Sequence, residues 1–521
     1  MMSQRMNAAD EVLGPPLAGG YAERPALLFE GGMLTYRELD SLVSRAANAI
    51  RRRGIGPGGR VLMLLNDSPA MVGTYLGAIR AGCVAVALNV RMSPPELLFA
   101  IEDSGAGLML ADKELLGTYS AVADQIGHRL DVVAVGEPGE TELGLGGLIS
   151  GADASFRTET MSPDDMAFWI YTSGTTGQPK AAVHLHRNVL SAGPYLRECL
   201  GVRAGDRIFS TSRLFFAYAL GNCVFGAFRL CATTILHRGW PEVESVARVV
   251  EATRPNILLS VPTMYRKLLS GGQASQEGFS TVRAYASAGE RLPVAIAEQW
   301  HRTTGVRIFE GMGSSETVYM VFSNSPAAYR PGSSGKLAPL AEARLTDDEG
   351  GPIQEPGRAG RLWVKMRSTC NGYWNRPEVS RKLFVGPWFV SGDLYSFDEE
   401  GFWYHRGRSD EMLKISGQWV APAEIEECAL NHPELADAAA VGATDAYGLT
   451  RLALFLVARS PESDRERLAD EVRAHLLGQL SVHKCPRDMR FIEQVPRTAT
   501  GKIQRYKLRD VLLALGDDAS G

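Results

Sequence analysis

The sequence has none of the features of a secreted or membrane-spanning chain. Its first residues, MMSQRMNAADEVLG, lack the apolar core of a secretory signal, and no stretch reaches about 18 uninterrupted apolar residues. It also lacks an excess of basic charge, because 55 Lys and Arg stand against 59 Asp and Glu, a formal net charge of -4. Such a balance gives no electrostatic footprint for nucleic acid or an anionic membrane. We therefore expect a cytoplasmic protein that acts on neither.

Cysteine is present but not in a functional pattern. Seven cysteines are scattered without a C-x-x-C pair, and their odd number argues against a complete disulfide framework. We expect reduced thiols, most of them buried. No Ser-His or Cys-His arrangement is recognisable either, so the sequence does not indicate catalysis by a nucleophilic side chain.

The length of 521 residues exceeds the size at which one hydrophobic core stops growing, so at least two domains are expected. Thr35 and Glu38 have the spacing of a capping box at the start of an amphipathic helix. Short apolar strands at 61–65, 84–87 and 108–110 then alternate with helices, an order that implies parallel sheets covered by helices.

The texture of the sequence changes after about residue 340, where short glycine-rich strands such as GRLWVKM and GFWYHRG indicate a small antiparallel sheet. We place a domain boundary near GRSDEM at 407–412. The predicted fold is therefore α/β. A large N-terminal domain, residues 1–409, has parallel helix-covered sheets plus a small antiparallel sheet. A small mobile α/β lid spans residues 410–521.

One polar segment, YTSGTTGQPK at 171–180, directly follows the apolar run 166–170. Its glycine N–H groups, four hydroxyls and the ammonium of Lys180 are donors suited to binding phosphate oxygens. Its spacing does not match the P-loop rule, which requires G-x-x-x-x-G-K followed by Ser or Thr. Taken alone, the segment also fits a surface loop rich in turn formers.

Four further polar and glycine-rich segments change this interpretation: GMGSSET at 311–317, SGDLY at 391–395, GRSDEMLKISGQWVAPAEIE at 407–426 and PRTATGKIQRYKLR at 496–509. Each is weak by itself. Together, and in this order, they resemble the ANL superfamily of adenylate-forming enzymes, which includes acyl-CoA ligases, luciferases and peptide-synthetase adenylation domains. The resemblance covers about residues 25–512.

The resemblance implies a nucleotide site. YTSGTTGQPK matches the family's mobile phosphate loop, which holds the β- and γ-phosphates of ATP and then pyrophosphate. Glu316 matches the carboxylate that holds Mg²⁺, Glu310 an acceptor for the adenine amino group, Asp393 the ligand of both ribose hydroxyls, and Arg408 a cation near ribose and phosphate. Met312 departs from the family's usual aromatic residue over adenine, and it still covers a ring face. The implied ATP- and AMP-binding residues are Thr172, Ser173, Gly174, Thr175, Thr176, Gly177, Ala288, Gly289, Glu290, Glu310, Gly311, Met312, Ser315, Asp393 and Arg408.

The C-terminal motifs imply a moving lid. Asp410 falls on the family's hinge position, although it also fits a simple turn. Lys502 matches the lysine that stabilises charge between the carboxylate and the α-phosphate, and with Glu316 and Lys180 it completes the implied catalytic set. Gly417 matches a glycine beside the pantetheine tunnel for CoA.

Within the superfamily, the sequence most resembles the benzoate-type aryl-CoA ligases. The segments that show this resemblance are LFFAYALGN, SVPTMY, SAGERLP and GMGSSE. In that group Ala217, Tyr218 and Gly313 would line a flat aryl pocket. Benzoate ligases show Met-Leu-His after the glutamate, whereas this chain has Thr317, Val318 and Tyr319. Tyr319 is either a neutral change at a pocket wall that tolerates substitution or a change that adapts the pocket to a ring substituent. The candidate acids are benzoate, anthranilate and the hydroxybenzoates, and among them we favour a small ortho-substituted benzoate such as anthranilate.

The predicted reaction is ATP-dependent and has two steps: an aryl acid and Mg-ATP give aryl-AMP and pyrophosphate, and the CoA thiol then displaces AMP. Two rivals remain. The first is an adenylating enzyme that loads a separate carrier protein, and the second is an inactive binding homologue, which the joint presence of the five charged site residues disfavours. Luciferase-like oxygenation has little support. The sequence leaves open a monomer or a homodimer.

Overall fold

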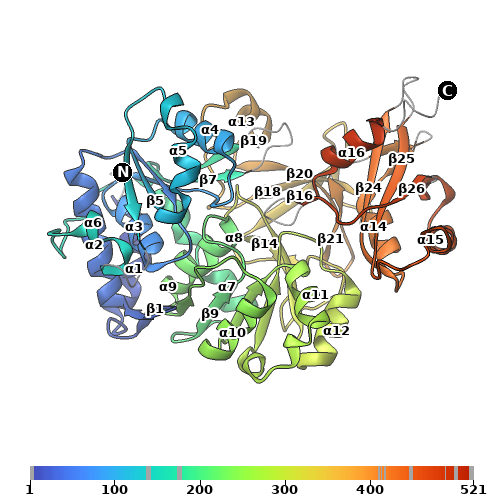
Figure 1. The fold of residues 1–521 in the computed structure, drawn as a ribbon, viewed down its shortest axis with the longest axis horizontal. Helices are drawn as coiled ribbons and strands as arrows, with labels where there is room; N and C mark the ends of the chain where they lie inside the picture. Colours follow the sequence, from blue (N-terminus) through green and yellow to red (C-terminus); the bar gives the residue numbers. More distant parts are fainter. Residues whose placement is uncertain are drawn as a thin grey trace.

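The structure is a computed structural model that describes residues 5–136, 142–172, 179–408, 411, 413–415, 418–444, 450–486, 488–497 and 503–514. Figure 1 shows a large body formed by the residues up to about 408 and a smaller unit, in orange and red, at one end. No helix in these ranges combines the length and the apolar character that crossing a membrane requires.

The first part of the large body is a sheet with strand order β6-β5-β3-β4-β7-β8, parallel except for the antiparallel β7–β8 pair. Helix α3 contacts β3 and β4 of this sheet, and α2 packs against α3. The two helices approach closely at Gly77, where a Cβ would lie 2.7 Å from the Cβ of Ala46. The elements are α1 Ala8–Ala18, α2 Tyr36–Arg52, β3 Arg60–Leu64, α3 Pro69–Arg80, β4 Val84–Ala87, α4 Pro94–Ser104, β5 Leu108–Asp112, α5 Leu116–Ser120, β6 Asp131–Val135, α6 Gly146–Ile149, β7 Met166–Thr172 and β8 Lys180–Leu185.

The second sheet has the order β15-β14-β13-β12-β11-β9-β10-β1-β2 and is parallel from β13 to β1. Helices α10, α11 and α12 bury their apolar faces against one side of it, around Trp300 and Tyr265. The largest core lies on the other side and also takes in residues of the first sheet. The elements are β1 Pro25–Phe29, β2 Gly32–Thr35, α7 Pro194–Cys199, β9 Arg207–Ser210, α8 Ala217–Ala219, the π-helix η5 Leu220–Gly226, α9 Ala227–Arg229, β10 Thr233–Ile235, α10 Val243–Thr253, β11 Ile257–Ser260, α11 Pro262–Ser270, β12 Ala284–Ser287, α12 Val294–Thr304, β13 Ile308–Gly313, β14 Met320–Ser323 and β15 Lys336–Leu337.

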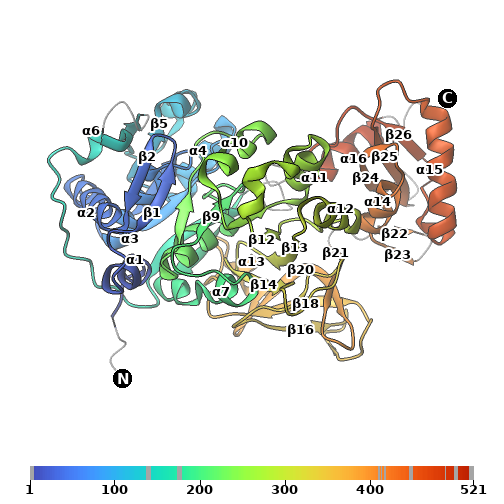
Figure 2. The ribbon, with the colours of Figure 1, turned by 90° about the horizontal axis from the view of Figure 1, so that it is seen from below.

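A third, antiparallel sheet closes the large body, with order β17-β16-β18-β20-β19 and β21 paired to β20. In Figure 2 this sheet, in tan, projects to one side of the two larger sheets. Its elements are β16 Glu342–Thr346, β17 Pro352–Ile353, β18 Gly360–Lys365, α13 Pro377–Leu383, β19 Phe384–Val385, β20 Trp388–Phe397 and β21 Trp403–Arg408.

The small C-terminal unit has its own core, built from the sheet β24-β25-β26 and the helices packed on it. Strands β24 and β25 are antiparallel and β26 is parallel to β25, so the unit is a small α/β layer. Its elements are β22 Leu413–Ile415, β23 Gln418–Val420, α14 Pro422–Leu430, β24 Leu435–Thr444, β25 Thr450–Ala458, α15 Arg465–Gln479, β26 Asp488–Phe491 and α16 Arg505–Ala514.

These observations confirm the predicted fold class: parallel helix-covered sheets, a small antiparallel sheet and a small α/β unit. The Thr35–Glu38 capping box is present, with the Glu38 N–H donating to Thr35 Oγ1 at 3.2 Å and the Thr35 N–H to Glu38 Oε2 at 2.8 Å. All seven cysteines are free thiols and five of them are buried, as expected. The boundary between residues 409 and 410 stays a prediction.

Candidate active site

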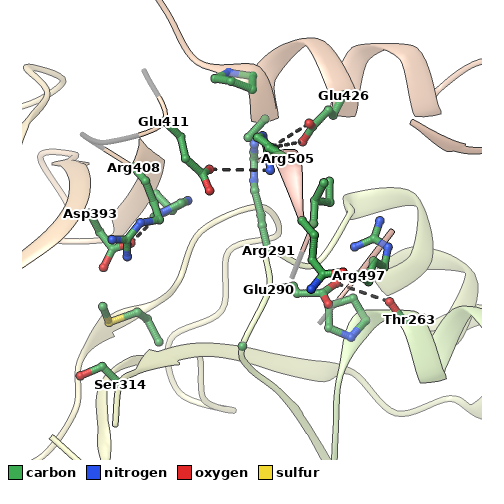
Figure 3. A pocket seen from close by; sticks show the side chains of 18 of the residues that line it. Thr263, Glu290, Arg291, Ser314, Asp393, Arg408, Glu411, Glu426, Arg497 and Arg505 are labelled. Atoms are coloured by element: carbon green, nitrogen blue, oxygen red, sulfur yellow. Dashed lines mark hydrogen bonds and ion pairs between the residues drawn. The ribbon is translucent and has the colours of Figure 1, made fainter. Parts of the chain in front are cut away.

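A cleft of about 2170 Å³ lies where the second sheet, the antiparallel sheet and the small C-terminal unit meet. A drug-sized ligand needs only about 300–1000 Å³, so this space is large enough for more than one substrate. Figure 3 shows that its walls carry many charged side chains from both units. Two contacts join the units at its edge: Arg266 donates to the Ala436 carbonyl, and Arg291 pairs with Glu427.

The ends of the predicted phosphate loop border this cleft. Thr172 is the last residue of β7 and Lys180 the first of β8, and the two are paired across the antiparallel ladder. The predicted loop residues between them lie outside the described residues: Ser173, Gly174, Thr175, Thr176 and Gly177. The structure therefore places only the two strand ends of this loop at the cleft.

Ser315 and Glu316 follow β13 and also border the cleft. The ring of His184, on β8, contacts the Ser315 carbonyl through Nε2 at 2.9 Å. Burial lowers the pKa of His184 to about 4, so the ring is neutral near pH 7 and donates this bond. Glu316 is 9% exposed, and its Oε1 accepts a 2.6 Å hydrogen bond from the hydroxyl of Tyr373. His184 thus holds the backbone at Ser315 in place.

Asp393 and Arg408 face each other across strands β20 and β21. Asp393 Oδ1 lies 3.6 Å from Arg408 Nη1 and 3.3 Å from Nε2 of His405. All three residues border the cleft, and Figure 3 shows the Asp393–Arg408 pair on one wall. The close pairing of a carboxylate and a cation is suited to a ribose diol beside a phosphate.

The predicted adenine side is formed by the loop after β12 and by β13. Gly289 has φ +91, a left-handed conformation that favours glycine. Burial raises the pKa of Glu290 to about 7 and of Glu310 to about 8, against nearby arginines that lower both. A protonated Glu310 both accepts and donates a hydrogen bond, so at neutral pH it is more than the simple acceptor that the sequence indicated. Gly311 and Met312 also border the cleft. Ala288 is buried and directly precedes Gly289, which borders the cleft.

Of the residues predicted to form the aryl pocket, some border the cleft and others are buried in the interior. Gly313 borders the cleft together with Phe215 and Phe216. Ala217 and Tyr319 are buried, and the Tyr319 ring would touch a Cβ added at Gly221 in the π-helix η5. π-Helical segments often mark functional sites. The hydroxyls of Tyr218 and Tyr319 are buried and have no hydrogen-bond partner among the described residues.

The small unit contributes charged residues that the sequence reasoning missed. Nη2 of Arg505, at the start of α16, donates to both carboxylate oxygens of Glu426 at 2.7 and 2.8 Å, and Arg497 pairs with Asp437 at 2.9 Å. In Figure 3 Arg505 lies beside Glu411 and Glu426, whereas Arg497 lies beside Glu290. Both arginines lie within the segment 496–509 that the sequence analysis quoted, but nothing in the sequence alone distinguished them from its other basic residues. The predicted Lys502, Asp410 and Gly417 lie outside the described residues.

The residues present fit a magnesium ion that arrives with a nucleotide. Mg²⁺ is usually held by one or two carboxylates plus phosphate oxygens and water. Glu316 supplies one carboxylate at the cleft, and the described residues contain no group of three or more side chains arranged to hold an ion by themselves. The donor set therefore suits an ion shared with substrate phosphates.

Comparisons with known proteins agree with this geometry. Residues 17–374 match the family of AMP-binding enzymes, and residues 424–502 match the AMP-binding enzyme C-terminal domain. The chain belongs to the AMP-binding enzymes, the adenylate-forming family that the motifs resembled.

Several relatives match over nearly the whole of both chains. A 3-hydroxybenzoate–CoA ligase of Aromatoleum sp. (strain CIB) is 46% identical over 98% of this chain and 97% of its own. A 3-hydroxybenzoate–CoA/4-hydroxybenzoate–CoA ligase of Thauera aromatica is 45% identical over 98% of both chains. Among solved structures, the anthranilate CoA ligase AuaEII in complex with anthranoyl-AMP has a TM-score of 0.92 at 31% identity over 98% of both chains. A benzoate CoA ligase from Burkholderia xenovorans LB400 has a TM-score of 0.88 at 33% identity, covering 97% of this chain and 100% of its own.

Proposed function

We propose that the protein is an ATP-dependent aryl-CoA ligase that converts a hydroxybenzoate, preferably 3-hydroxybenzoate, into its CoA thioester. The acid attacks the α-phosphorus of ATP to give aryl-AMP and pyrophosphate, and the CoA thiol then attacks the acyl carbon and releases AMP. Relatives of 46% and 45% identity named for 3-hydroxybenzoate support this substrate. The seven free thiols support a reducing compartment such as the cytoplasm.

Each site residue has a role in this proposal. Lys180 and the phosphate loop hold the β- and γ-phosphates, Asp393 binds the ribose and Arg408 lies near ribose and phosphate. Glu316 holds Mg²⁺, which neutralises phosphate charge when bound. Lys502 stabilises the charge that develops at the α-phosphate, Asp410 is the hinge of the lid, and Gly417 keeps the thiol tunnel open. No nucleophilic side chain is needed, because binding aligns acid and ATP.

The observation that carries the choice of substrate is the 46% and 45% identity to two ligases named for 3-hydroxybenzoate. Tyr319 is the residue that we assign to recognition of the ring hydroxyl. Its side chain is 3% exposed, and its oxygen has no hydrogen-bond partner among the described residues. Burying a hydroxyl without a partner costs about 1–3 kcal/mol, so a substrate hydroxyl that reaches it would be stabilised.

The test is pyrophosphate release with Mg-ATP, with and without CoA. The acids are 3-hydroxybenzoate, 4-hydroxybenzoate, benzoate, 2-aminobenzoate and a medium-chain fatty acid. We expect the highest kcat/KM with 3-hydroxybenzoate plus CoA. Highest turnover with 2-aminobenzoate would favour the ortho-substituted substrate that the sequence suggested. Preference for the fatty acid would refute the aryl-CoA ligase.

Tyr319→Phe tests the role of the hydroxyl directly. We expect the ratio of kcat/KM for 3-hydroxybenzoate over benzoate to fall roughly three- to tenfold, the effect of one neutral hydrogen bond. Tyr36→Phe is the matched control, since Tyr36 is also buried and donates its hydroxyl to the Ala232 carbonyl at 2.6 Å, outside the cleft. An unchanged ratio in Tyr319→Phe would remove Tyr319 from substrate recognition.

One further relative supports an acceptor of the aryl group other than CoA. The p-hydroxybenzoic acid–AMP ligase FadD22 of Mycobacterium marinum is 30% identical over 94% of this chain, which spans 67% of that protein. The alternative is therefore an enzyme that forms aryl-AMP and loads a carrier protein. If free CoA leaves turnover unchanged while aryl-AMP still accumulates, the carrier is the acceptor. We predict a monomer or a homodimer, and the molar mass from light scattering distinguishes the two.

A further inference from the structure

Tyr373 lies in a segment that runs alongside β8. The Asn371 N–H donates to the Val183 carbonyl at 2.8 Å and the Trp374 N–H to the Ala181 carbonyl at 2.9 Å. Ala182 forms an isolated antiparallel bridge with Tyr373 itself. The segment therefore behaves as a short extra strand, and its backbone position is fixed against the strand that begins at Lys180.

The side chain of Tyr373 is fixed as well. It is 7% exposed, and the ring of Phe384 packs edge-on against it with centroids 5.5 Å apart. Its backbone N–H donates to Ser380 Oγ at 2.9 Å. A ring that is packed on one side and tethered at the backbone presents its face and hydroxyl in one orientation.

Two proposed site residues meet at this ring. The hydroxyl donates to Glu316 Oε1 at 2.6 Å, and Lys180 Nζ lies 4.9 Å from the centroid of the ring. Glu316 and Lys180 are 136 residues apart in sequence, and Tyr373 comes from a third segment. All three border the same cleft.

The chemistry of these contacts suits a phosphate site. A hydrogen bond to one carboxylate oxygen of Glu316 orients the group and leaves the second oxygen for another ligand. An aromatic face attracts the ammonium of Lys180 without neutralising its charge, as a carboxylate would do.

We propose that Tyr373 is a positioning residue that holds Lys180 and Glu316 in place for the magnesium–triphosphate group of ATP. It acts through these two residues and does not itself take part in bond making. The inference depends on the proposed use of ATP but not on which acid is activated. It assigns a function to residues 371–374, NGYW, which the sequence analysis did not single out.

The test is binding of a non-hydrolysable ATP analogue, measured by calorimetry over a titration of Mg²⁺, without any acid. For Tyr373→Phe we expect the Mg²⁺ concentration at half-maximal nucleotide binding to rise roughly tenfold, the effect of one hydrogen bond to a charged group. Binding in EDTA should change little, because Phe keeps the ring under Lys180. Tyr373→Leu should weaken binding in EDTA as well.

Two further variants separate positioning from folding. Tyr36→Phe removes a buried hydroxyl that also donates at 2.6 Å but does not border the cleft, and it should leave the Mg²⁺ titration unchanged. In a Glu316→Gln background, Tyr373→Phe should add less than a twofold change, since the partner of the hydroxyl is already altered. Full additivity of the two changes would overturn the proposal.

A Mg²⁺ titration of Tyr373→Phe that matches the unsubstituted enzyme would also overturn it. If Tyr373→Phe fails to fold, the same coupling is measured with Tyr373→His, which keeps a ring and a donor and should retain most of the Mg²⁺ response. A protein that shows this Mg²⁺ dependence but turns over no aryl acid would refute the proposed substrate and still support the role of Tyr373.

Discussion

The ion pair between Arg505 and Glu426 makes a strong prediction about the lid. Arg505 donates to both carboxylate oxygens at 2.7 and 2.8 Å, and the side chains are only 12% and 10% exposed. Glu426 also accepts the Ala440 N–H at 2.8 Å, and Glu411 lies 3.7 Å from Arg505. This cluster ties α16 to α14, and α16 begins three residues after Lys502.

The expected magnitude follows from the burial. Removing one partner of a buried pair leaves an uncompensated charge and costs about 3–5 kcal/mol. Burial raises the pKa of Glu426 despite the neighbouring Arg505, so desolvation outweighs the pairing for this carboxylate. For that reason, replacing both partners with apolar side chains should cost far less than replacing one.

The assay is hydrogen exchange by mass spectrometry on peptides from α14 and α16. Arg505→Met should raise exchange there by more than about a hundredfold, which corresponds to about 3 kcal/mol. The double variant Glu426→Leu with Arg505→Met should recover most of the protection. A change below tenfold in Arg505→Met, or a double variant worse than the single one, would refute the reasoning.

Three further predictions concern stability and catalysis. Glu310 is protonated in the native state up to about pH 8, whereas the unfolded carboxyl titrates near 4.5, so its contribution to native stability should fall as pH rises between these values. Glu310→Gln should make the pH slope of the melting curves shallower at pH 5–9, and the buried Glu290 should account for part of the remaining slope. Gly335→Ala should cost more than about 3 kcal/mol in denaturant titration, because φ is +91 and its Cβ would lie 1.9 Å from the Ser323 backbone carbon. Gly357→Ala, with φ +82 and open space, should cost only about 1 kcal/mol. Lys502→Ala should suppress aryl-AMP formation far more than thioester formation from supplied aryl-AMP.

Each of these predictions has a contradicting outcome. A parallel pH slope in Glu310→Gln would mean that another group titrates. Equal costs for the two glycine variants would show that contact at Gly335 does not matter. Equal losses in both half-reactions of Lys502→Ala would contradict its proposed role.

Local sequence signals predicted the parts of the fold that depend on near neighbours. The Thr35–Glu38 cap and the strand at 84–87 were predicted correctly, because capping and short apolar runs act within a few positions. The order of the glycine-rich motifs identified the family, since each motif is a contiguous stretch of chain. The site residues Asp393 and Arg408 were found in the same way, and the structure places both at the cleft.

The sequence by itself therefore determined the fold class and the reaction family, and it supplied most candidate site residues. Only the tertiary structure decided which of them meet. Tyr373 joins Lys180 and Glu316 from three distant segments, and Arg505 pairs with Glu426 across the small unit. Burial also set the protonation of Glu310. These features depend on long-range packing and on exclusion of water, which no short stretch of sequence encodes.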